Sequence, residues 1–244
     1  MKKTLTILLI LCVATALFAS KGFSVNAGGA FDLFNLKTDK SDGDEYYDTF
    51  KGNGLGFDIG VQYDFSSKIM AYADFNMVFP SDFEITRTYD AATLSTTFKE
   101  LIETDEMEAK LTNGTASHYA FLLDASIGVA YKFDFNPIEI AVGGGAYINL
   151  LKAKTGFKGT VIVIEEERLF SFLTVGVSAL VEAKYIINDN IAVRLAVLPQ
   201  LGIFSKRDID VYHNGTRVDA ESGSLSGVGI SFTMPVAIGA SYSF

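Results

Sequence analysis

The chain has very little cysteine, histidine and tryptophan. Its 244 residues include one cysteine, two histidines and no tryptophan. The cysteine, Cys12, lies in a leading segment that we expect to be removed. The mature protein should therefore contain neither a disulfide framework nor a thiolate metal site, and we predict no metal site and no cofactor.

Basic residues are also scarce. The chain has 20 lysines and arginines against 29 aspartates and glutamates, which gives a formal net charge of −9. Without Lys2 and Lys3, 18 basic residues remain against 29 acidic ones, and the net charge becomes −11. A chain this acidic repels phosphate backbones, so we exclude nucleic acid as a partner.

Long apolar runs are missing beyond the first twenty residues, although 49% of all residues are hydrophobic. The leading segment has Lys2 and Lys3, an apolar run over 5–18, and small residues at Ala19 and Ser20. This order is typical of a secretory signal peptide, and the run is shorter than the roughly 20 residues of a membrane helix. We predict a signal peptide over residues 1–20 and one mature domain over 21–244.

The mature chain alternates between apolar and polar residues along most of its length. From Leu55 to Phe65 and from Tyr119 to Phe133, bulky apolar residues occupy every second position. Strict period-two alternation predicts β-strands with one apolar face. Six further segments of this kind bring the number of predicted strands to eight: 22–36, 69–80, 138–152, 169–187, 191–204 and 227–244. Each exceeds the roughly 9 to 11 residues that a tilted membrane strand needs.

The lengths of the connections support a barrel. Short polar turns at 66–68, 136–137 and 188–190 alternate with long polar stretches at 37–53, 81–117, 153–168 and 205–226. Outer-membrane barrels have short periplasmic turns and long extracellular loops. The sequence therefore predicts an all-β fold, an eight-stranded antiparallel up-and-down transmembrane β-barrel in a bacterial outer membrane. Both termini would be periplasmic and the loops extracellular.

A soluble barrel of the lipocalin kind would also alternate and would also follow a signal peptide. Here, however, the polar face is rich in glycine, alanine and serine, which fit a narrow lumen, while bulky aliphatic residues form the other face. This arrangement favours contact with outer-membrane lipid. Aromatic residues gather at strand ends, as in the interfacial girdles of membrane barrels: Tyr63, Phe65, Tyr131, Phe133, Phe135, Tyr185 and Tyr242 at one end, and Phe31, Phe79 and Tyr119 at the other.

The last residues resemble the C-terminal pattern of outer-membrane barrels. That pattern has a glycine, an aromatic residue three positions later and a terminal phenylalanine, here Gly239, Tyr242 and Phe244. The resemblance implies that the barrel-assembly machinery recognises this terminal strand.

Two stretches are similar to the OmpW family of small barrels. They are 55–85, with Phe79-Pro80 after the third strand, and 184–188, which enters a short turn. OmpX and the OmpA membrane domain are more distant architectural relatives. The resemblance implies a role in the passage of small hydrophobic molecules.

Alternation and turn position assign a depth to each lumen residue. Inward residues near the turns are mostly charged, and we name this set the charged floor: Asp64, Lys132, Asp134, Glu139, Glu182, Lys184 and Arg194. Turn lengths place Lys184 opposite Arg194 and Asp134 opposite Glu139. Like charges face each other, so basic and acidic hairpins must meet across the lumen to avoid unpaired buried charge. The floor would close the barrel, and a purely stabilising salt-bridged plug is an open alternative.

Apolar inward residues nearer the loops predict a hydrophobic pocket of Leu122, Tyr147, Leu198 and Phe204. Pro199 and Pro235 interrupt neighbouring strands, and proline cannot donate to a ladder. Together they predict a lateral exit through the wall. The alternative is that each proline only accommodates a bulge.

Catalysis is not expected, because His118 and His213 have no base or nucleophile at a recognisable spacing. The competing function is binding of host surface ligands or cations by a structural or adhesin-like barrel, through acidic outer loops. The acids of the first two loops are Asp39, Asp42, Asp44, Glu45, Asp48, Glu100, Glu103, Asp105, Glu106 and Glu108. Thr97 and Glu100 have capping-box spacing and predict a short helix in the second loop.

Overall fold

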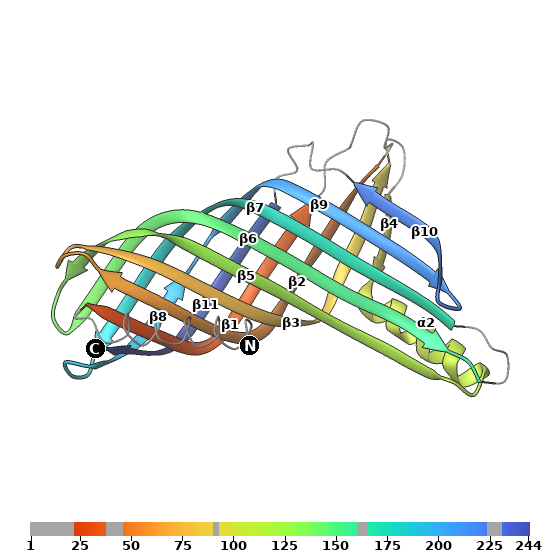
Figure 1. The fold of residues 1–244 in the computed structure, drawn as a ribbon, viewed down its shortest axis with the longest axis horizontal. Coiled ribbons are helices and arrows are strands. Elements are labelled where there is room, and N and C mark those ends of the chain that lie inside the picture. The colour runs from red at the N-terminus through yellow and green to blue at the C-terminus, as the bar shows by residue number, and fades with distance from the viewer. Residues whose placement is uncertain (1–21, 38–45, 90–92, 161–164, 224–230) are drawn as a thin grey trace, which may run out of the picture.

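The computed structural model describes residues 22–37, 46–89, 93–160, 165–223 and 231–244. The predicted signal peptide lies outside these ranges and stays a prediction. The described chain folds into one antiparallel sheet with a single helix (Figure 1). Its elements are β1 (Phe23–Lys37), β2 (Tyr46–Asp64), β3 (Ile69–Tyr89), β4 (Thr93–Thr97), α2 (Phe98–Leu111), β5 (Thr115–Asp134), β6 (Ile138–Lys158), β7 (Glu165–Ile186), β8 (Ile191–Val197), β9 (Gln200–His213), β10 (Thr216–Gly223) and β11 (Ser231–Ser243).

The sheet closes into a ring because β1 pairs with β11 as well as with β2. Going round the ring, the order is β1, β2, β3, β5, β6, β7, then β8 followed by β9, and β11. Strands β8 and β9 together form one strand of the ring, the β8–β9 strand, which is interrupted at Leu198 and Pro199. The ring therefore has eight strands, and the predicted antiparallel barrel is confirmed. Strand β4 pairs with β3 outside the ring, and β10 pairs with β9.

The barrel has an apolar outside and a polar inside. Leu55, Ile127 and Ile238 point outward and are 70%, 66% and 62% exposed, whereas the inward Asp58 and Gln62 are buried. A lipocalin-like barrel would show the opposite pattern, with its apolar face turned inward. The soluble alternative is therefore excluded by the arrangement of the side chains.

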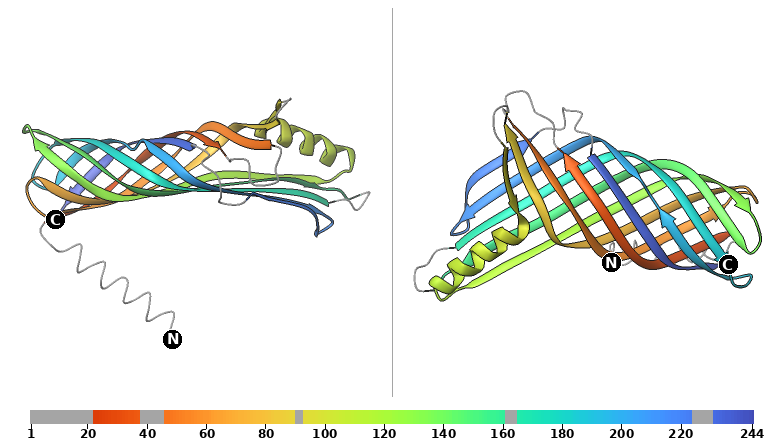
Figure 2. Two further views of the ribbon diagram at one scale, coloured as in Figure 1. Left: turned by 90° about the horizontal axis from the view of Figure 1, so that it is seen from above. Right: turned by 180° about the vertical axis from the view of Figure 1, so that it is seen from behind.

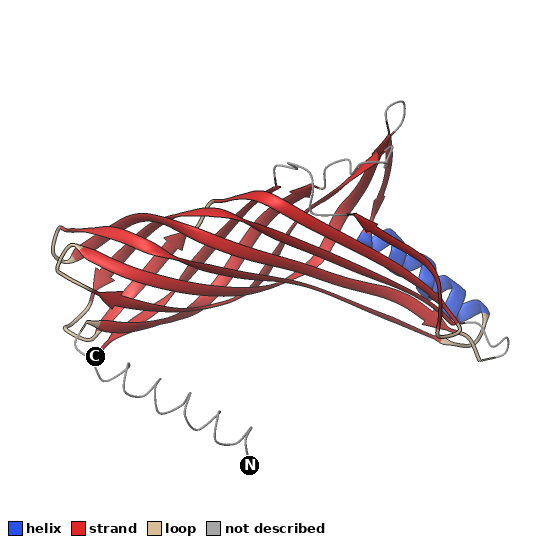
Figure 3. Ribbon diagram, turned by 45° about the horizontal axis from the view of Figure 1, so that its top comes forward, coloured by secondary structure: helices blue, strands red, loops and turns tan. Residues whose placement is uncertain are grey.

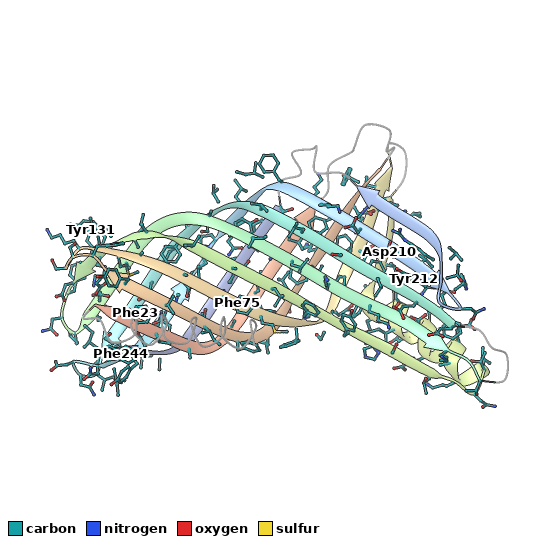
Figure 4. The ribbon with its side chains drawn as sticks, in the orientation of Figure 1. Phe23, Phe75, Tyr131, Asp210, Tyr212 and Phe244 are labelled. Carbon is teal, nitrogen blue, oxygen red and sulfur yellow. The ribbon has the colours of Figure 1, made fainter. Side chains whose placement is uncertain are left out.

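Three tight turns lie at one end of the barrel, which we call the turn end; the opposite end is the loop end. Ser66 and Asn188 hold two of these turns, since their side-chain oxygens accept hydrogen bonds from backbone N–H groups two and three residues later. The backbone N–H of Phe244 donates to the carbonyl of Phe23 at 3.0 Å and joins the last residue to β1. The turn-end aromatics predicted as a girdle are exposed, and Figure 4 shows Tyr131 at the same end of the barrel as Phe23 and Phe244.

At the loop end the strands are longer than the sequence predicted. Residues 153–168, expected to form a loop, mostly continue β6 and begin β7, and residues 205–223 form the β9–β10 hairpin. Strands β5, β6, β7, β9 and β10 therefore project beyond the ring as a sheet (Figures 2 and 3). The hairpin turns at Asn214 and Gly215, which both have positive φ, as a two-residue type I′ turn requires.

Helix α2 covers one face of the projecting sheet (Figure 2). The predicted capping box starts it: the N–H of Glu100 donates to Thr97 Oγ1, and the N–H of Thr97 donates to Glu100 Oε2 at 2.8 Å. The Phe98 ring stacks on Phe83 with a 4.7 Å separation between ring centroids. The helix thereby adds to an apolar cluster at the loop end of the lumen. Among the described helices, none has the length and apolar character needed to cross a membrane.

Candidate functional site in the barrel interior

Part of the predicted charged floor lies at the turn end, around Lys132. The Nζ atom of Lys132 is 2.6 Å from Asp64 Oδ2 and 3.2 Å from Glu139 Oε2, and its side chain is largely buried. Asp134 stands opposite Glu139 as expected. It is nevertheless exposed in the turn, where Oδ1 accepts a hydrogen bond from the N–H of Asn136. Asp134 is therefore a turn residue and does not take part in the ion pairs of the floor.

Arg194 lies deeper in the lumen and is surrounded by three carboxylates. Its guanidinium nitrogens lie 2.5 Å from Glu182, 2.7 Å from Asp58 and 2.6 Å from Asp74. Arg194 is 1% exposed although arginine is one of the largest side chains. These ion pairs connect β8 with β7 and, across the lumen, with β2 and β3, so charged side chains fill the interior at this level.

Lys184 stands opposite Arg194 in the β7–β8 ladder, as the turn length predicted. Acceptors separate the two cations: Lys184 donates to Gln62 Oε1 and lies 3.6 Å from Glu182. Gln62 in turn donates to Glu182 at 2.7 Å. Both cations of this pair are therefore satisfied by acceptors, which lie on β2, β3 and β7.

Sequence reasoning missed Asp58, Asp74 and Gln62 as members of this cluster. All three lie on the inward face of their strands, so alternation shows that they line the lumen. Alternation does not show that they lie at the depth of Arg194, because they belong to strands on another side of the ring.

The structure does not bring the four predicted pocket residues into one cavity. Leu122 and Leu198 are fully buried but belong to different apolar clusters. Tyr147 is also buried, and its ring lies against two glycines: a Cβ atom at Gly176 or Gly202 would come within 2.8 or 2.9 Å of it. These side chains pack the interior and leave no common pocket.

The assignment of Phe204 to the lumen is wrong. Phe204 is 54% exposed on the outer surface. In the β7–β9 ladder, Val175 pairs with Phe204 and Gly176 pairs with Gly202, so Ile203 is an extra residue on β9. A bulge of one residue turns every later side chain to the opposite face.

Pro199 and Pro235 lie on opposite sides of the β8–β9 strand: Pro199 within this strand faces β7, and Pro235 on β11 faces the strand from the other side. The carbonyl of Pro235 accepts a hydrogen bond from the N–H of Leu198, and the carbonyl of Pro199 accepts one from Ala179, both at 2.9 Å. Each proline lacks the N–H that would complete its pair. The pairing of the β8–β9 strand with β7 and its pairing with β11 are thus each weakened at one position, while the acceptor bonds hold both closed.

A cleft of about 290 Å³ opens at the loop end between the β3–β4 hairpin and strands β7 and β9. Its lining is mostly apolar and comprises Asp48, Ile85, Arg87, Leu94, Ser95, Thr96, Arg168, Phe170, Ile209 and Val211. Arg87 binds Asp48 with both Nε and Nη2, at 2.9 and 3.1 Å, and Arg207 also binds Asp48. Asp48 therefore lies buried at the bottom of the cleft, although the sequence suggested an exposed acidic residue in a loop.

Other predicted loop residues have structural contacts. Asp105 pairs with Arg168 at 3.1 Å and ties α2 to β7, and Glu100 caps the helix. His213 is exposed 3.6 Å from Glu166, and His118 is exposed on β5. The first-loop acids at 39–45 lie outside the described residues.

No family model and no curated protein matches the chain. Its structure is similar to that of a major outer membrane protein from Thermus thermophilus, with a TM-score of 0.55 and 14% identity over 91% of this chain and 99% of the other. The outer membrane protein OprG from Pseudomonas aeruginosa aligns with a TM-score of 0.47 and 13% identity over 92% and 96% of the two chains. At these identities the likeness concerns the fold alone, and the relation to OmpW stays a prediction. The chain has the fold of a small bacterial outer-membrane β-barrel.

Proposed function

We propose that this protein is an integral outer-membrane barrel that takes up small, mainly hydrophobic molecules at its loop end without an open pore through its axis. The observation that carries the proposal is the apolar cleft at the loop end, which lies above a lumen filled by the Arg194 ion pairs. The apolar outer surface favours insertion in lipid. The strand extensions and α2 lie at the loop end, where such barrels have their large extracellular parts.

A cleft of this size suits a small solute. Ile85, Leu94, Phe170, Ile209 and Val211 supply apolar contact. The guanidinium groups of Arg87 and Arg168 are partly exposed and lie beside this apolar wall. Pockets with a mostly apolar lining and a few fixed polar groups are typical of small-molecule sites. The proposed solute is therefore apolar with at most one acceptor group.

Binding is tested with a hydrophobic fluorescent probe and the refolded protein in detergent. We expect Ile209→Asn to weaken probe binding about tenfold, because a polar group enters the apolar wall. Leu111→Asn, at the exposed end of α2, is the matched control and should bind like the parent. Equal binding by parent and Ile209→Asn would remove the cleft from the proposal.

A sideways route remains part of the proposal, because the filled lumen leaves the bilayer as the way out of the cleft. Pro199 and Pro235 weaken the wall on the two sides of the β8–β9 strand and are the candidate exit. In liposomes, the Pro199→Ala, Pro235→Ala double variant should take up a hydrophobic solute more slowly than the parent. Unchanged uptake at equal membrane level rules out the proline-defined exit and leaves each proline as a local irregularity.

The alternative is a non-transporting surface protein whose outer loops bind host ligands or cations. The projecting sheet supports it, because it carries Asp210 and Tyr212 well beyond the barrel wall (Figure 4). Paired liposome assays with a hydrophilic and a hydrophobic solute separate the two functions. Uptake of neither solute favours the surface function, and both functions are non-enzymatic.

A further inference from the structure

The outer surface of the barrel has a groove of about 550 Å³ across β2, β3, β5 and β6, which we call the outer groove. Its lining is almost entirely apolar. Bulky side chains that point away from the lumen surround it, and they are Ile59, Val61, Phe75, Ile127 and Ile148 (Figure 4 labels Phe75). Because this surface is the one that faces lipid, the outer groove opens toward the bilayer and not toward the lumen.

Three alanines produce the hollow. Ala73, Ala125 and Ala146 line the outer groove from the adjacent strands β3, β5 and β6. The ladder partners of Ala125 are much larger and flank it on both sides, Phe75 on β3 and Ile148 on β6. A flexible hydrocarbon chain can follow such a hollow and make the dispersion contacts that an empty space lacks.

Strand β6 connects the outer groove with a row of lysines. Its outward residues are apolar or glycine from Ile138 to Leu150, and lysines follow on the same face at positions 152, 154 and 158. Lys152 comes four residues after Ile148, which is about 13 Å along a strand. One leaflet contributes roughly 15 Å to the hydrocarbon core of a bilayer, half of about 30 Å. The outer groove therefore lies in the leaflet at the loop end, and the lysines begin where the apolar band stops.

Aromatic rings mark the headgroup level beside these lysines. Phe121 pairs with Lys152, and Tyr119 pairs with Lys154, across the β5–β6 ladder. The two rings are stacked with 6.0 Å between their centroids. Aromatic girdles lie at the interface between the apolar band and the headgroups, so both lysines are at the level of lipid phosphates.

Lys152 is the lysine that can bind a phosphate. Its ladder partner on β7 is Ser171, a hydroxyl donor, and no carboxylate of the described chain forms an ion pair with it. Lys154, by contrast, has its Nζ atom 2.7 Å from Glu167 Oε2. An apolar groove and an uncompensated ammonium group on the same strand match the two parts of one lipid molecule, its acyl chain and its phosphate.

We propose that the outer groove and Lys152 form a binding site for one phosphate-carrying membrane lipid. An acyl chain lies along Ala73, Ala125 and Ala146, and the phosphate binds Lys152 and Ser171. The site goes beyond the proposed uptake function, because it shares no residue with the loop-end cleft and faces away from the lumen. The competing occupant of the outer groove is a second copy of this chain.

The experiment uses the absence of tryptophan from the chain, because one introduced tryptophan then reports on the lipid beside it. Leu150→Trp places the reporter on β6 between the outer groove and Lys152. Leu33→Trp is the matched control on β1, four strands away round the ring. The refolded full mature chain is placed in phosphatidylcholine vesicles that contain a fixed fraction of either phosphatidylglycerol or phosphatidylcholine with brominated, quenching acyl chains. We expect brominated phosphatidylglycerol to quench Leu150→Trp more strongly than brominated phosphatidylcholine does, and the two lipids to quench Leu33→Trp equally.

Two substitutions in the Leu150→Trp background test the two parts of the site. Lys152→Gln should lower the preference for phosphatidylglycerol about fivefold, the usual effect of one basic residue at an anionic surface. Lys158→Gln is the matched control, because Lys158 pairs with Glu165 farther along β6, and it should keep the preference. Ala125→Leu fills the hollow and should also reduce the preference, and Ala146→Leu replaces it if that variant does not fold.

Equal quenching of Leu150→Trp by the two lipids would overturn the site, and so would a preference that survives either substitution. Weak quenching by both lipids would show that a second copy covers the outer groove, which also contradicts the proposal. Mobility of the unheated protein in gels verifies that each variant is folded. Solute uptake is not measured, so failure of the proposed transport leaves this test unaffected.

Discussion

Replacing Arg194 by alanine should be among the most damaging single changes in the barrel. The substitution removes three ion pairs of 2.5 to 2.7 Å from a residue with 1% exposure. Asp58 and Asp74 would then have no basic partner among the described residues, and Glu182 would have only Lys184 at 3.6 Å. Breaking a buried pair by removing one partner costs about 3 to 5 kcal/mol, mainly because the remaining charge is buried and uncompensated. We expect Arg194→Ala to lower the free energy of unfolding by that amount.

Urea unfolding of the protein in lipid vesicles measures this loss, followed by circular dichroism and by gel mobility without heating. Arg217→Ala is the matched control, because Arg217 makes an exposed ion pair with Asp210 and surface pairs contribute less than about 1 kcal/mol.

A variant that replaces Arg194 by methionine and changes Asp58 and Asp74 to asparagine should recover much of the stability, because Glu182 keeps Lys184 and the other two carboxylates are gone. A loss below about 1 kcal/mol for Arg194→Ala would refute the reasoning. It would mean that water surrounds these carboxylates and that the lumen is open at this level.

Three further predictions concern the C-terminus and the loop helix. Deleting Phe244 should lower the amount of protein in the outer membrane without affecting export, and immunoblots of membrane and periplasmic fractions at equal expression would show no change if the terminal pattern were irrelevant. Thr97→Ala should destabilise α2 by about 0.5 to 2 kcal/mol through loss of its N-cap, seen as faster hydrogen exchange in 98–111 but not in the barrel strands. The pKa of Glu100 is lowered, first by the hydrogen bond from the backbone N–H of Thr97 and then by the hydrogen bond from the Thr96 side chain. The stability that ionised Glu100 adds to α2 is therefore fully present above the unfolded pKa of about 4.3. It is lost as pH falls through the lower folded pKa. Exchange in α2, corrected for its intrinsic rate, should therefore accelerate below about pH 4 in the parent and show no such step in Glu100→Gln.

The number and direction of the ring strands could be predicted because alternation is a local property. Their length could not, and β6 shows why. Its outer residues become polar beyond Lys152, since that face leaves the apolar band, while Ala153 and Phe157 still pack inward. A segment with water on one face and a helix-covered cluster on the other looks like a polar loop in sequence. Only the tertiary contact with α2 shows that the strand continues.

The side chains that face the lumen could be predicted as long as inward and outward residues alternated without interruption from the turn. Lys132, Lys184 and Arg194 lie between the turn end and the first irregularity of their strands, and all three face the lumen as expected. Phe204 lies beyond the bulge at Ile203 and faces outward.

The partners of Arg194 show a second limit. Asp58 and Asp74 come from β2 and β3, and the depth at which they meet β8 depends on the tilt and stagger of the whole ring. No local pattern contains that stagger. Alternation therefore decides which residues enter the lumen of such a barrel, whereas closure of the ring decides which of them can form one site.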